Sequence, residues 1–399
     1  MMPSIKQHLS LIILFLSTSC HEPRELSTDT EMSMDTETSI DTELSIDTEI
    51  SINEEPKDNF YVGADLSYVN EMEDCGAVYK NFNGEDSDVY DIFEHAGANL
   101  VRVRLWHNPT WTSYSDLDDV KKTIQRIKSH NMTVLLDFHY SDEWADPSKQ
   151  EIPSAWESEL HNTDALSQLL YDYTYDVLNE LNNEGLLPNI VQIGNEINGN
   201  ILTQGDPFPI DWTRNATLLN NGIQAVRDLS VSIDDDIEVL LHIAQPEHAL
   251  WWFDEATQNG VVDFDWIGLS YYSAWSEYDL SNLEPVLTDL RTAYNKKLMI
   301  VETAYPFTLE DVDSASNILG DQAIVPNHPP TQQGQLDYLI SLKNIVSSSG
   351  GKGLVYWEPA WVSTDCDTQW GVGSHWDNAT LFDHQHQATK GLEFYRDHD

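Results

Sequence analysis

Eight short apolar runs with high β-propensity recur along the chain and alternate with helix-like stretches such as 116–131 and 163–185. The runs cover residues 60–68, 99–106, 133–140, 190–197, 238–244, 264–272, 297–304 and 353–359. Strands that alternate with helices indicate parallel βαβ units. Eight such units in about 340 residues favour an α/β fold of the (β/α)8 TIM-barrel type over an open sheet. No GxGxxG follows the first run, which argues against a dinucleotide-binding domain.

Nearly every apolar run ends in polar or aromatic side chains. The active site of a TIM barrel is built at the carboxyl ends of its strands, so we expect these side chains to meet at one mouth. They are Asp65, Arg102, Asp137, His139, Asn195, Glu196, His242, Tyr272, Glu302 and Trp357.

Two of these residues are glutamates that end the fourth and seventh runs, Glu196 in "IVQIGNEI" and Glu302 in "KLMIVETA". Two carboxyl groups that face each other across a mouth suit glycoside hydrolysis, in which one is protonated and the other ionised. Different surroundings separate the two pKa values. The alternative is that each carboxylate caps a helix or joins an ion pair, which explains one glutamate more easily than both.

Several segments carry a resemblance to a known family and cover residues 60 to 385 in order. They are "GADLSYVNEMEDCGAVYKNFNG", "VRVRLWHNP", "LDFHYSDEWADPSKQEIPSAW", "VQIGNEINGNIL", "GLSYY", "VETAYP", "YWEPAW" and "GSHWDNATLFD". The chain resembles glycoside hydrolase clan A and, within it, the family 53 endo-β-1,4-galactanases. This resemblance implies retaining endo-hydrolysis of the β-1,4-galactan in pectic type I (arabino)galactan, without a catalytic cofactor.

The resemblance also implies roles for the residues at the mouth. Glu196 would be the general acid/base and Glu302 the nucleophile, with the carboxyl groups about 5–5.5 Å apart, as in retaining enzymes. Asn195 would bind the sugar 2-hydroxyl group. Arg102 would keep Glu302 ionised, and Tyr272 would hydrogen-bond Glu302.

Histidine and tryptophan side chains complete the substrate-binding set that the resemblance implies. His139 and His242 would line the mouth; the alternative is that each is a hydrogen-bonded barrel histidine. Four tryptophans would stack on successive galactosyl units, although one or two could belong to the core: Trp144, Trp275, Trp357 and Trp361. The chain departs from the family in "YYSAW", where Ser273 replaces a proline and leaves the details of the cleft open.

The segment "DVDSASN", residues 311–317, has the alternating oxygen ligands of a calcium loop. Bacterial family members have a similar loop, which Asp311, Asp313 and Asn317 match, while Ala315 replaces a histidine. A structural Ca²⁺ is therefore expected, with a plain acidic loop as the alternative. No His/Cys cluster suggests zinc.

The chain contains three cysteines. Cys75 follows the first run and Cys366 the eighth, and these strands become neighbours when a barrel closes. In an oxidising compartment the two cysteines are expected to form a disulfide.

The first 58 residues do not read as part of the fold. Residues 1–19 resemble a lipoprotein signal peptide, with Lys6, an apolar run and small residues before Cys20, which would carry lipid. Ser17 stands where such signals usually have leucine, so simple secretion is the alternative. Residues 20–58 contain four acidic hexapeptides and are expected to be a linker, followed by a catalytic domain over 59–399. The chain is therefore expected to be exported, as an outer-membrane or cell-surface lipoprotein or as a secreted protein.

A net charge of −48 argues against binding nucleic acid or anionic membranes directly, so the membrane contact would be through lipid alone. It also favours a neutral polysaccharide as the substrate. A monomer is the default expectation. Two other functions stay open: another clan A endo-glycanase, such as a mannanase or cellulase, and a non-catalytic surface glycan-binding protein.

Overall fold

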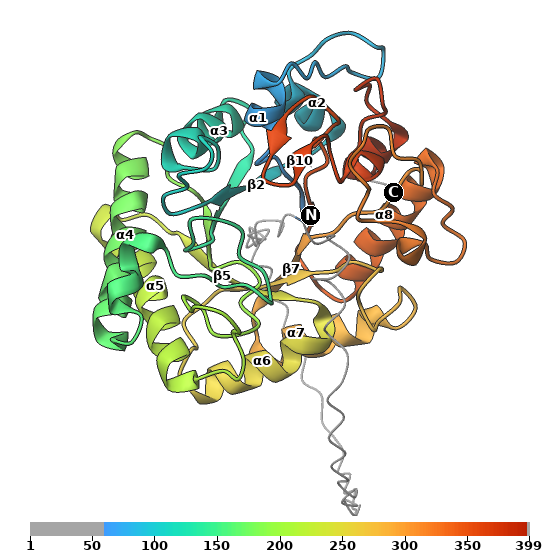
Figure 1. Ribbon diagram of the computed structural model, residues 1–399. Helices are drawn as coiled ribbons and strands as arrows, with labels where there is room; N and C mark the ends of the chain where they lie inside the picture. The colour runs from blue at the N-terminus through green and yellow to red at the C-terminus, as the bar shows by residue number, and fades with distance from the viewer. Residues whose placement is uncertain (1–59, 397–399) are drawn as a thin grey trace, which may run out of the picture. The chain divides into compact units, whose positions relative to one another are not determined.

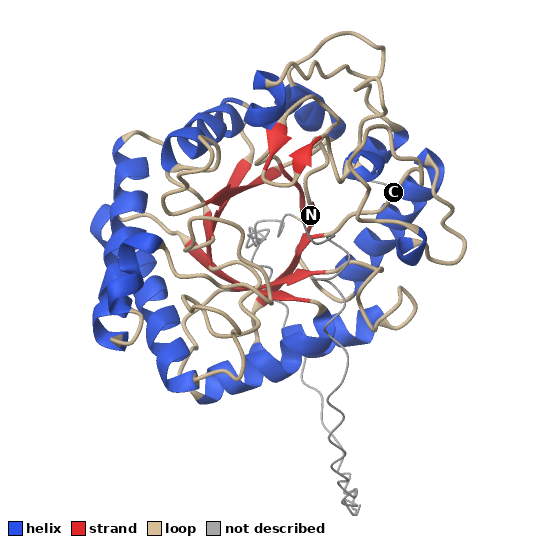
Figure 2. Ribbon diagram, viewed as in Figure 1, coloured by secondary structure: helices blue, strands red, loops and turns tan. Residues whose placement is uncertain are grey.

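The computed structural model describes residues 60–396, which form a closed barrel of parallel strands surrounded by helices (Figures 1 and 2). The strands follow chain order from β1 to β8, and β1 pairs with β8 to close the ring. The predicted (β/α)8 TIM barrel is thus confirmed. The predicted signal peptide, linker and lipidated Cys20 lie outside the described residues.

The barrel strands coincide with the eight apolar runs. They are β1 (Tyr61–Asp65), β2 (Leu100–Leu105), β3 (Thr133–Phe138), β4 (Ile190–Ile193), β5 (Glu238–Ala244), β6 (Trp266–Ser270), β7 (Lys297–Glu302) and β8 (Gly353–Tyr356). A short hairpin, β9 (Asp367–Thr368) and β10 (Gly371–Val372), follows the last barrel strand.

The helices around the barrel differ widely in length. They are α1 (Val69–Asp74), α2 (Val89–Ala96), α3 (Leu117–Ser129), α4 (Thr163–Asn183), α5 (Trp212–Ile233), α6 (Pro246–Gln258), α7 (Leu283–Tyr294) and α8 (Gln332–Ser348). Short 3-10 helices are η2 (Ser154–Glu159), η3 (Asp321–Ala323), η4 (Asp377–Ala379) and η5 (Lys390–Tyr395). No helix within residues 60–396 is both long and apolar enough to span a lipid bilayer.

Polar residues start several of these helices because their side chains accept hydrogen bonds from the first free backbone N–H groups. The Asp116 side chain accepts a hydrogen bond from the backbone of Asp119 at the start of α3. Thr331 does the same for Gly334 at the start of α8. These caps fix where the helices begin after the loops that carry the mouth.

Strand alternation divides the core into two parts. A large cluster fills the space between the strands and the helices, and a small one fills the amino-terminal half of the barrel interior. The small cluster consists of Leu100, Leu135, Ile190, Leu240, Trp266, Met299, Val301 and Val355. Because side chains alternate along a strand, the residue two places after Leu100 is also directed inward, and this residue is Arg102. The carboxyl-terminal half of the interior is therefore polar.

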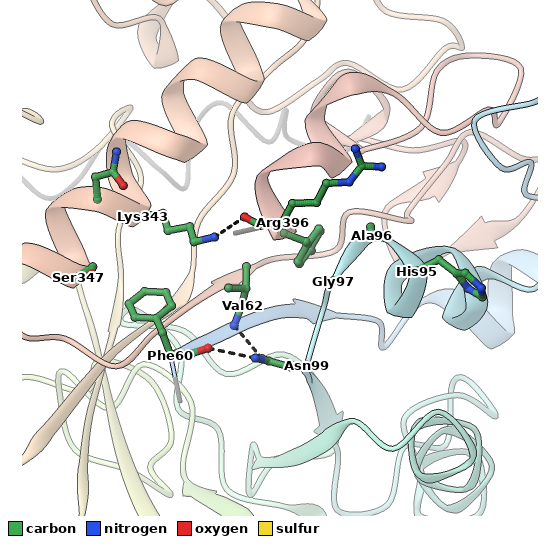
Figure 3. A pocket seen from close by; sticks show the side chains of 11 residues that line it. Phe60, Val62, His95, Ala96, Gly97, Asn99, Lys343, Ser347 and Arg396 are labelled. Carbon is green, nitrogen blue, oxygen red and sulfur yellow. Dashed lines mark hydrogen bonds between the residues drawn. The ribbon is translucent and has the colours of Figure 1, made fainter. Parts of the chain in front are cut away.

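A pocket of about 550 Å³ lies at the amino-terminal side of the barrel, where the described chain begins and ends (Figure 3). Asn99 closes it by accepting a hydrogen bond from Val62 N and donating one to the Phe60 carbonyl. Lys343 donates to the Arg396 carbonyl at 2.8 Å. No carboxyl side chain lines this pocket, and the two glutamates lie at the other end of the strands. It is therefore not the candidate active site.

Candidate active site

Glu196 and Glu302 lie at the carboxyl ends of β4 and β7, on the same rim of the barrel. Glu302 is the last residue of β7 and is only 6% exposed. Glu196 follows β4 in a turn and is half-buried. The two carboxyl groups predicted from the sequence thus share one mouth.

A register shift between β6 and β7 turns Glu302 into this mouth. Leu269 aligns with Ile300, but the next residue, Ser270, aligns with Glu302 and skips Val301. Val301 packs in the interior cluster, so regular alternation would direct the following side chain outward. An added residue in one strand re-aims the side chains beside it. The bulge therefore lets Val301 and Glu302 both face inward.

Arg102 and Tyr272 hold the Glu302 carboxyl group. Arg102 Nη1 lies 2.9 Å from Glu302 Oε1, and the Tyr272 hydroxyl donates to Oε2 at 3.1 Å. Arg102 is 1% exposed and also binds Asp65 and Asp137 at 2.8 Å each. The buried guanidinium charge opposes the effect of burial and favours the ionised form of Asp137 and Glu302. Arg102 and Tyr272 occupy the positions expected of them.

The turn after β4 has an unusual backbone. Gly194 has φ 83° and Glu196 has φ 44°, a left-handed conformation that residues other than glycine seldom adopt. Gln150 stabilises this turn by donating to the carbonyls of Asn195 and Glu196. The Asn195 side chain accepts from Arg102 Nη2 at 2.8 Å. Backbone strain of this kind clusters at functional sites.

The surroundings separate the protonation states of the two carboxyl groups. Burial raises the pKa of Glu196 well above its usual value, and the charge of Glu302 raises this pKa further. Burial also raises the pKa of Glu302, to about 7, but the charge of Arg102 opposes this rise. Glu196 therefore holds the proton while Glu302 carries the charge. A protonated and an ionised carboxyl group at one mouth can act as an acid and a nucleophile.

His139 and His242 are buried in the barrel wall below the mouth. His139 Nδ1 accepts from Ala145 N, so its Nε2 carries the hydrogen that faces Asp137 at 3.1 Å. His242 Nε2 lies 2.9 Å from the Ser270 hydroxyl. Burial lowers the pKa of both histidines, and most strongly that of His242. Both are therefore neutral, hydrogen-bonded parts of the site.

The predicted tryptophan platforms differ in accessibility. Trp144 and Trp357 are half-buried with ring centroids 6.0 Å apart, and Trp275 is 37% exposed. Trp361 is 1% exposed and stacks on Tyr68 at 4.3 Å between centroids. Three of the four tryptophans thus keep solvent-exposed surface. Trp361 instead packs inside the loop that follows β8.

The sequence did not identify Trp370, which lies in the turn between β9 and β10. Its side chain is 42% exposed, and its ring centroid is 6.5 Å from that of Trp144. The neighbouring Gln369 donates to Glu143, so the hairpin reaches the loop after β3. Because the hairpin lies outside the eight apolar runs, no periodic pattern marks it.

Two polar barrel residues were also missed. Gln192 on β4 donates to Asp137 at 2.6 Å and accepts from Arg102 Nε at 3.1 Å. Ser270 at the end of β6 donates to Glu196 Oε1 at 2.6 Å. Each lies an even number of residues after an inward apolar residue of its strand. The alternation of inward side chains could have found both.

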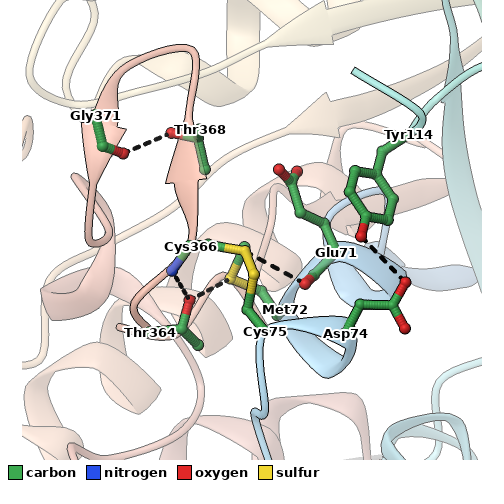
Figure 4. The surroundings of a disulfide bond; sticks show 9 residues. All are labelled: Glu71, Met72, Asp74, Cys75, Tyr114, Thr364, Cys366, Thr368 and Gly371. Carbon is green, nitrogen blue, oxygen red and sulfur yellow. Dashed lines mark hydrogen bonds between the residues drawn. A yellow bond between two sulfur atoms is a disulfide. The ribbon is translucent and has the colours of Figure 1, made fainter.

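Cys75 and Cys366 form a disulfide with Cα atoms 5.4 Å apart (Figure 4). Cys75 follows α1, and Cys366 directly precedes β9. Cys366 is buried and lies against the Glu71 carbonyl. The bond therefore ties the base of the hairpin that carries Trp370 to α1.

The predicted calcium ligands of the loop 311–317 do not all lie together. The Asn317 amide nitrogen donates to Asp311 at 2.9 Å and to Asp377 at 2.8 Å, and lies 3.4 Å from the Glu310 carbonyl. Asp313 accepts hydrogen bonds from Ser363 and from the backbone of Ser374. Within the described residues, Asp311 and Asn317 thus come together with Asp377, which the sequence did not suggest, while Asp313 binds elsewhere.

A family model described as glycosyl hydrolase family 53 matches residues 61–395. The chain is 57% identical over 327 residues to the arabinogalactan endo-β-1,4-galactanase of Cellvibrio japonicus (strain Ueda107), covering 81% of this chain and 86% of that protein.

Solved structures also share this fold. A GH53 catalytic domain of Ignisphaera aggregans matches with a TM-score of 0.78 and 30% identity, covering 86% of this chain and 97% of that one. A structure of fungal β-1,4-galactanases matches with a TM-score of 0.73 and 34% identity, covering 84% of this chain and 98% of that one.

Proposed function

The chain belongs to glycosyl hydrolase family 53, and we infer that it is an arabinogalactan endo-β-1,4-galactanase. It is a glycoside hydrolase, and such enzymes need no catalytic cofactor. The observation that carries the mechanism is the contrast between the two carboxyl groups. Glu302 lies against the charge of Arg102, whereas the side chain that hydrogen-bonds the Glu196 carboxyl group within residues 60–396 is an uncharged serine.

In the proposed mechanism Glu302 attacks the anomeric carbon while Glu196 gives its proton to the leaving oxygen. The glycosidic bond breaks, and the sugar becomes an ester of Glu302. Glu196, now ionised, then takes a proton from a water molecule, whose oxygen displaces Glu302 from the same carbon. The product keeps its anomeric configuration, and both glutamates return to their first protonation states. The carboxyl groups should be about 5–5.5 Å apart for this sequence of steps.

The residues around the pair support binding of a neutral polysaccharide. Asn195 is held by Arg102 and Gln150 and is proposed to bind the 2-hydroxyl group of the reacting sugar. Half-buried Trp144 and Trp357 and exposed Trp275 are proposed to stack on galactosyl rings. His139, His242 and Tyr272 would support the site from the barrel wall.

Release of reducing sugar from linear β-1,4-galactan, compared with β-mannan, cellulose and β-1,3-galactan, tests the proposal. Activity on β-1,4-galactan alone supports it. Activity on another glycan would favour a different clan A endo-glycanase. Binding of galactan without hydrolysis would favour a non-catalytic glycan-binding protein. The Glu302→Ala variant is the control, since it should bind galactan without cleaving it.

We further propose that the 311–317 loop binds a structural Ca²⁺. Asp311, Asp377 and the Glu310 carbonyl surround the Asn317 amide nitrogen, and these three oxygens suit a calcium ion. Asn317 would offer its amide oxygen after rotating, while Asp313 would stay with its serine partners. The melting temperature in EGTA should rise when Ca²⁺ is restored. Asp311→Asn should show a smaller rise. If Ca²⁺ leaves the melting temperature of wild type unchanged, and wild type melts with Asp311→Asn, the loop is a plain acidic loop.

The amino-terminal residues support a proposal about export. Residues 1–19 would be removed as a signal peptide, Cys20 would carry lipid, and residues 20–58 would tether the enzyme to a cell surface. The catalytic domain would act as a monomer. Fractionation of cells that produce wild type and Cys20→Ser tests the anchor. Wild type is expected with the membranes and the variant in the soluble fraction; equal distribution would favour simple secretion.

A further inference from the structure

Ser270 lies between the proposed acid/base, Glu196, and the buried His242. Its side chain is fully buried at the end of β6, and its hydroxyl oxygen is 2.6 Å from Glu196 Oε1 and 2.9 Å from His242 Nε2. The register shift described above sets it directly beside Glu302. Within residues 60–396 it is the side chain that hydrogen-bonds the Glu196 carboxyl group.

A serine hydroxyl has one hydrogen to donate and lone pairs that accept. When Glu196 is ionised, Ser270 donates its hydrogen to the carboxylate and accepts one from His242 Nε2. When Glu196 is protonated, its proton must be on Oε2 to reach the leaving oxygen, so Oε1 can still accept the hydrogen of Ser270. The three side chains can therefore be fully hydrogen-bonded in both states of Glu196.

His242 has the partners that this arrangement requires. Its Nδ1 atom lies 2.9 Å from the Asn195 Oδ1 acceptor, 3.2 Å from the Gln192 Nε2 donor and 3.3 Å from the Glu196 backbone N–H. Without a hydrogen, Nδ1 can accept from these two donors, which leaves the ring hydrogen on Nε2, where it faces Ser270.

We propose that Ser270, backed by His242, is a positioning residue that holds the Glu196 carboxyl group in place in both of its protonation states. A retaining mechanism needs this because the same carboxyl group is an acid in the first step and a base in the second. The inference rests on the proposed function and assigns Ser270 a role within it.

The other charged groups near Glu196 do not replace this contact. Glu302 on β7 and Asp146 after β3 repel its charge, and Arg102 on β2 attracts it without bonding to it. Of these neighbours, the Ser270 hydroxyl alone stabilises the ionised form through a hydrogen bond, which lowers the pKa of Glu196. Loss of the hydroxyl should thus raise that pKa and leave the carboxyl group free to rotate.

The test compares wild type, Ser270→Ala and Ser270→Cys with Ser349→Ala as the matched control. Ser349 is a buried serine whose hydroxyl donates to the Val346 carbonyl at the end of α8, at the opposite end of the barrel. Each protein is assayed on β-1,4-galactan across pH and on an aryl β-galactobioside with a good leaving group. Melting temperatures show whether each variant folds.

Ser270→Ala should lose about 10- to 100-fold in kcat on galactan, part of the usual acid/base contribution. Its basic limb should move to higher pH, and on the aryl substrate it should show a burst, because the second step still needs Glu196 as a base. Should Ser270→Ala not fold, the weak thiol donor of Ser270→Cys should give the same changes at smaller size. Ser349→Ala should keep the wild-type profile.

The inference would be overturned if wild type is active but the folded Ser270 variant keeps the basic limb of the wild-type pH profile. This holds whether or not kcat falls. A wild type without activity on β-1,4-galactan would instead overturn the proposed function, and this inference with it. The two failures are therefore distinguishable in one experiment.

Discussion

Glu302 lies in register with Ser270, where regular continuation from the preceding pair, Leu269 and Ile300, would place Val301. This shift directs the proposed nucleophile toward Arg102, whose Nη1 is 2.9 Å away, and pairs it with Ser270, whose hydroxyl binds the Glu196 carboxyl group. One added residue in one strand thus brings Glu302 to the buried arginine of the site.

The Glu196→Ala variant should distinguish the acid role from a binding role. Without a proton donor, cleavage of galactan should fall by about 10²–10⁴-fold. An aryl galactobioside with a good leaving group should still react in the first step, because departure of the aryl group needs no acid. Added azide should then speed turnover and give a β-galactosyl azide. Equal losses on both substrates would contradict the assignment of Glu196.

The activity should depend on pH through both carboxyl groups. Glu302 must be ionised, so kcat/KM should fall as the pH drops through its raised pKa of about 7. Glu196 must be protonated, so kcat/KM should fall again as the pH rises through its pKa, which is well above the usual value. A bell-shaped profile is expected. A profile that is flat between pH 5 and 9 would contradict both shifts.

Glu196→Gln should stabilise the fold while it inactivates the enzyme. The pKa of Glu196 is raised in the folded protein, so ionisation costs stability at pH values above its unfolded pKa of about 4.3. Below that pH the carboxyl group is protonated in both states, and the variant should melt with wild type. Above it the variant should melt at the higher temperature, with a difference that grows as pH rises. Thermal melts at pH 4 and pH 8 measure this, and Glu157→Gln, the same change at an exposed glutamate, serves as the control.

The disulfide should contribute to stability more than to chemistry. Cys75 and Cys366 are 291 residues apart, so the bond restricts a long stretch of the unfolded chain. Replacing both with serine should lower the free energy of unfolding by roughly 2–4 kcal/mol, measured by urea titration. Hydrolysis of a short aryl substrate should stay near wild type, since neither cysteine contacts the glutamates. A large loss of kcat on that substrate in the folded variant would contradict this separation.

The sequence predicted the barrel and the rim well because both follow from local patterns. Each strand is an apolar run, and the side chains that end the runs stay at the mouth, as Glu196 and Glu302 do. Local patterns do not predict contacts between segments that are far apart in the chain. The alternation of "LMIVE" alone would set Glu302 on the opposite face from Val301, and the bulge depends on pairing with β6.

The loops show the same limit. Trp361 was grouped with the sugar platforms, yet it packs on Tyr68, while Trp370 reaches Trp144 from a hairpin that no periodic pattern reveals. Asp377, which follows β8 in the chain, shares the Asn317 amide group with Asp311. Such partners come from the packing of loops that are far apart in the chain, which spacing within one segment does not encode.

The most direct test of the proposed mechanism is to identify the residue that forms the covalent intermediate. The enzyme is incubated with an aryl 2-deoxy-2-fluoro-β-galactobioside, whose fluorine slows the second step, and its peptides are then analysed by mass spectrometry. The mechanism predicts one added fluorogalactobiosyl group on Glu302, in the peptide that contains "MIVETAY". A label on Glu196 or another residue, or prompt cleavage of galactan with inversion of configuration, would contradict it.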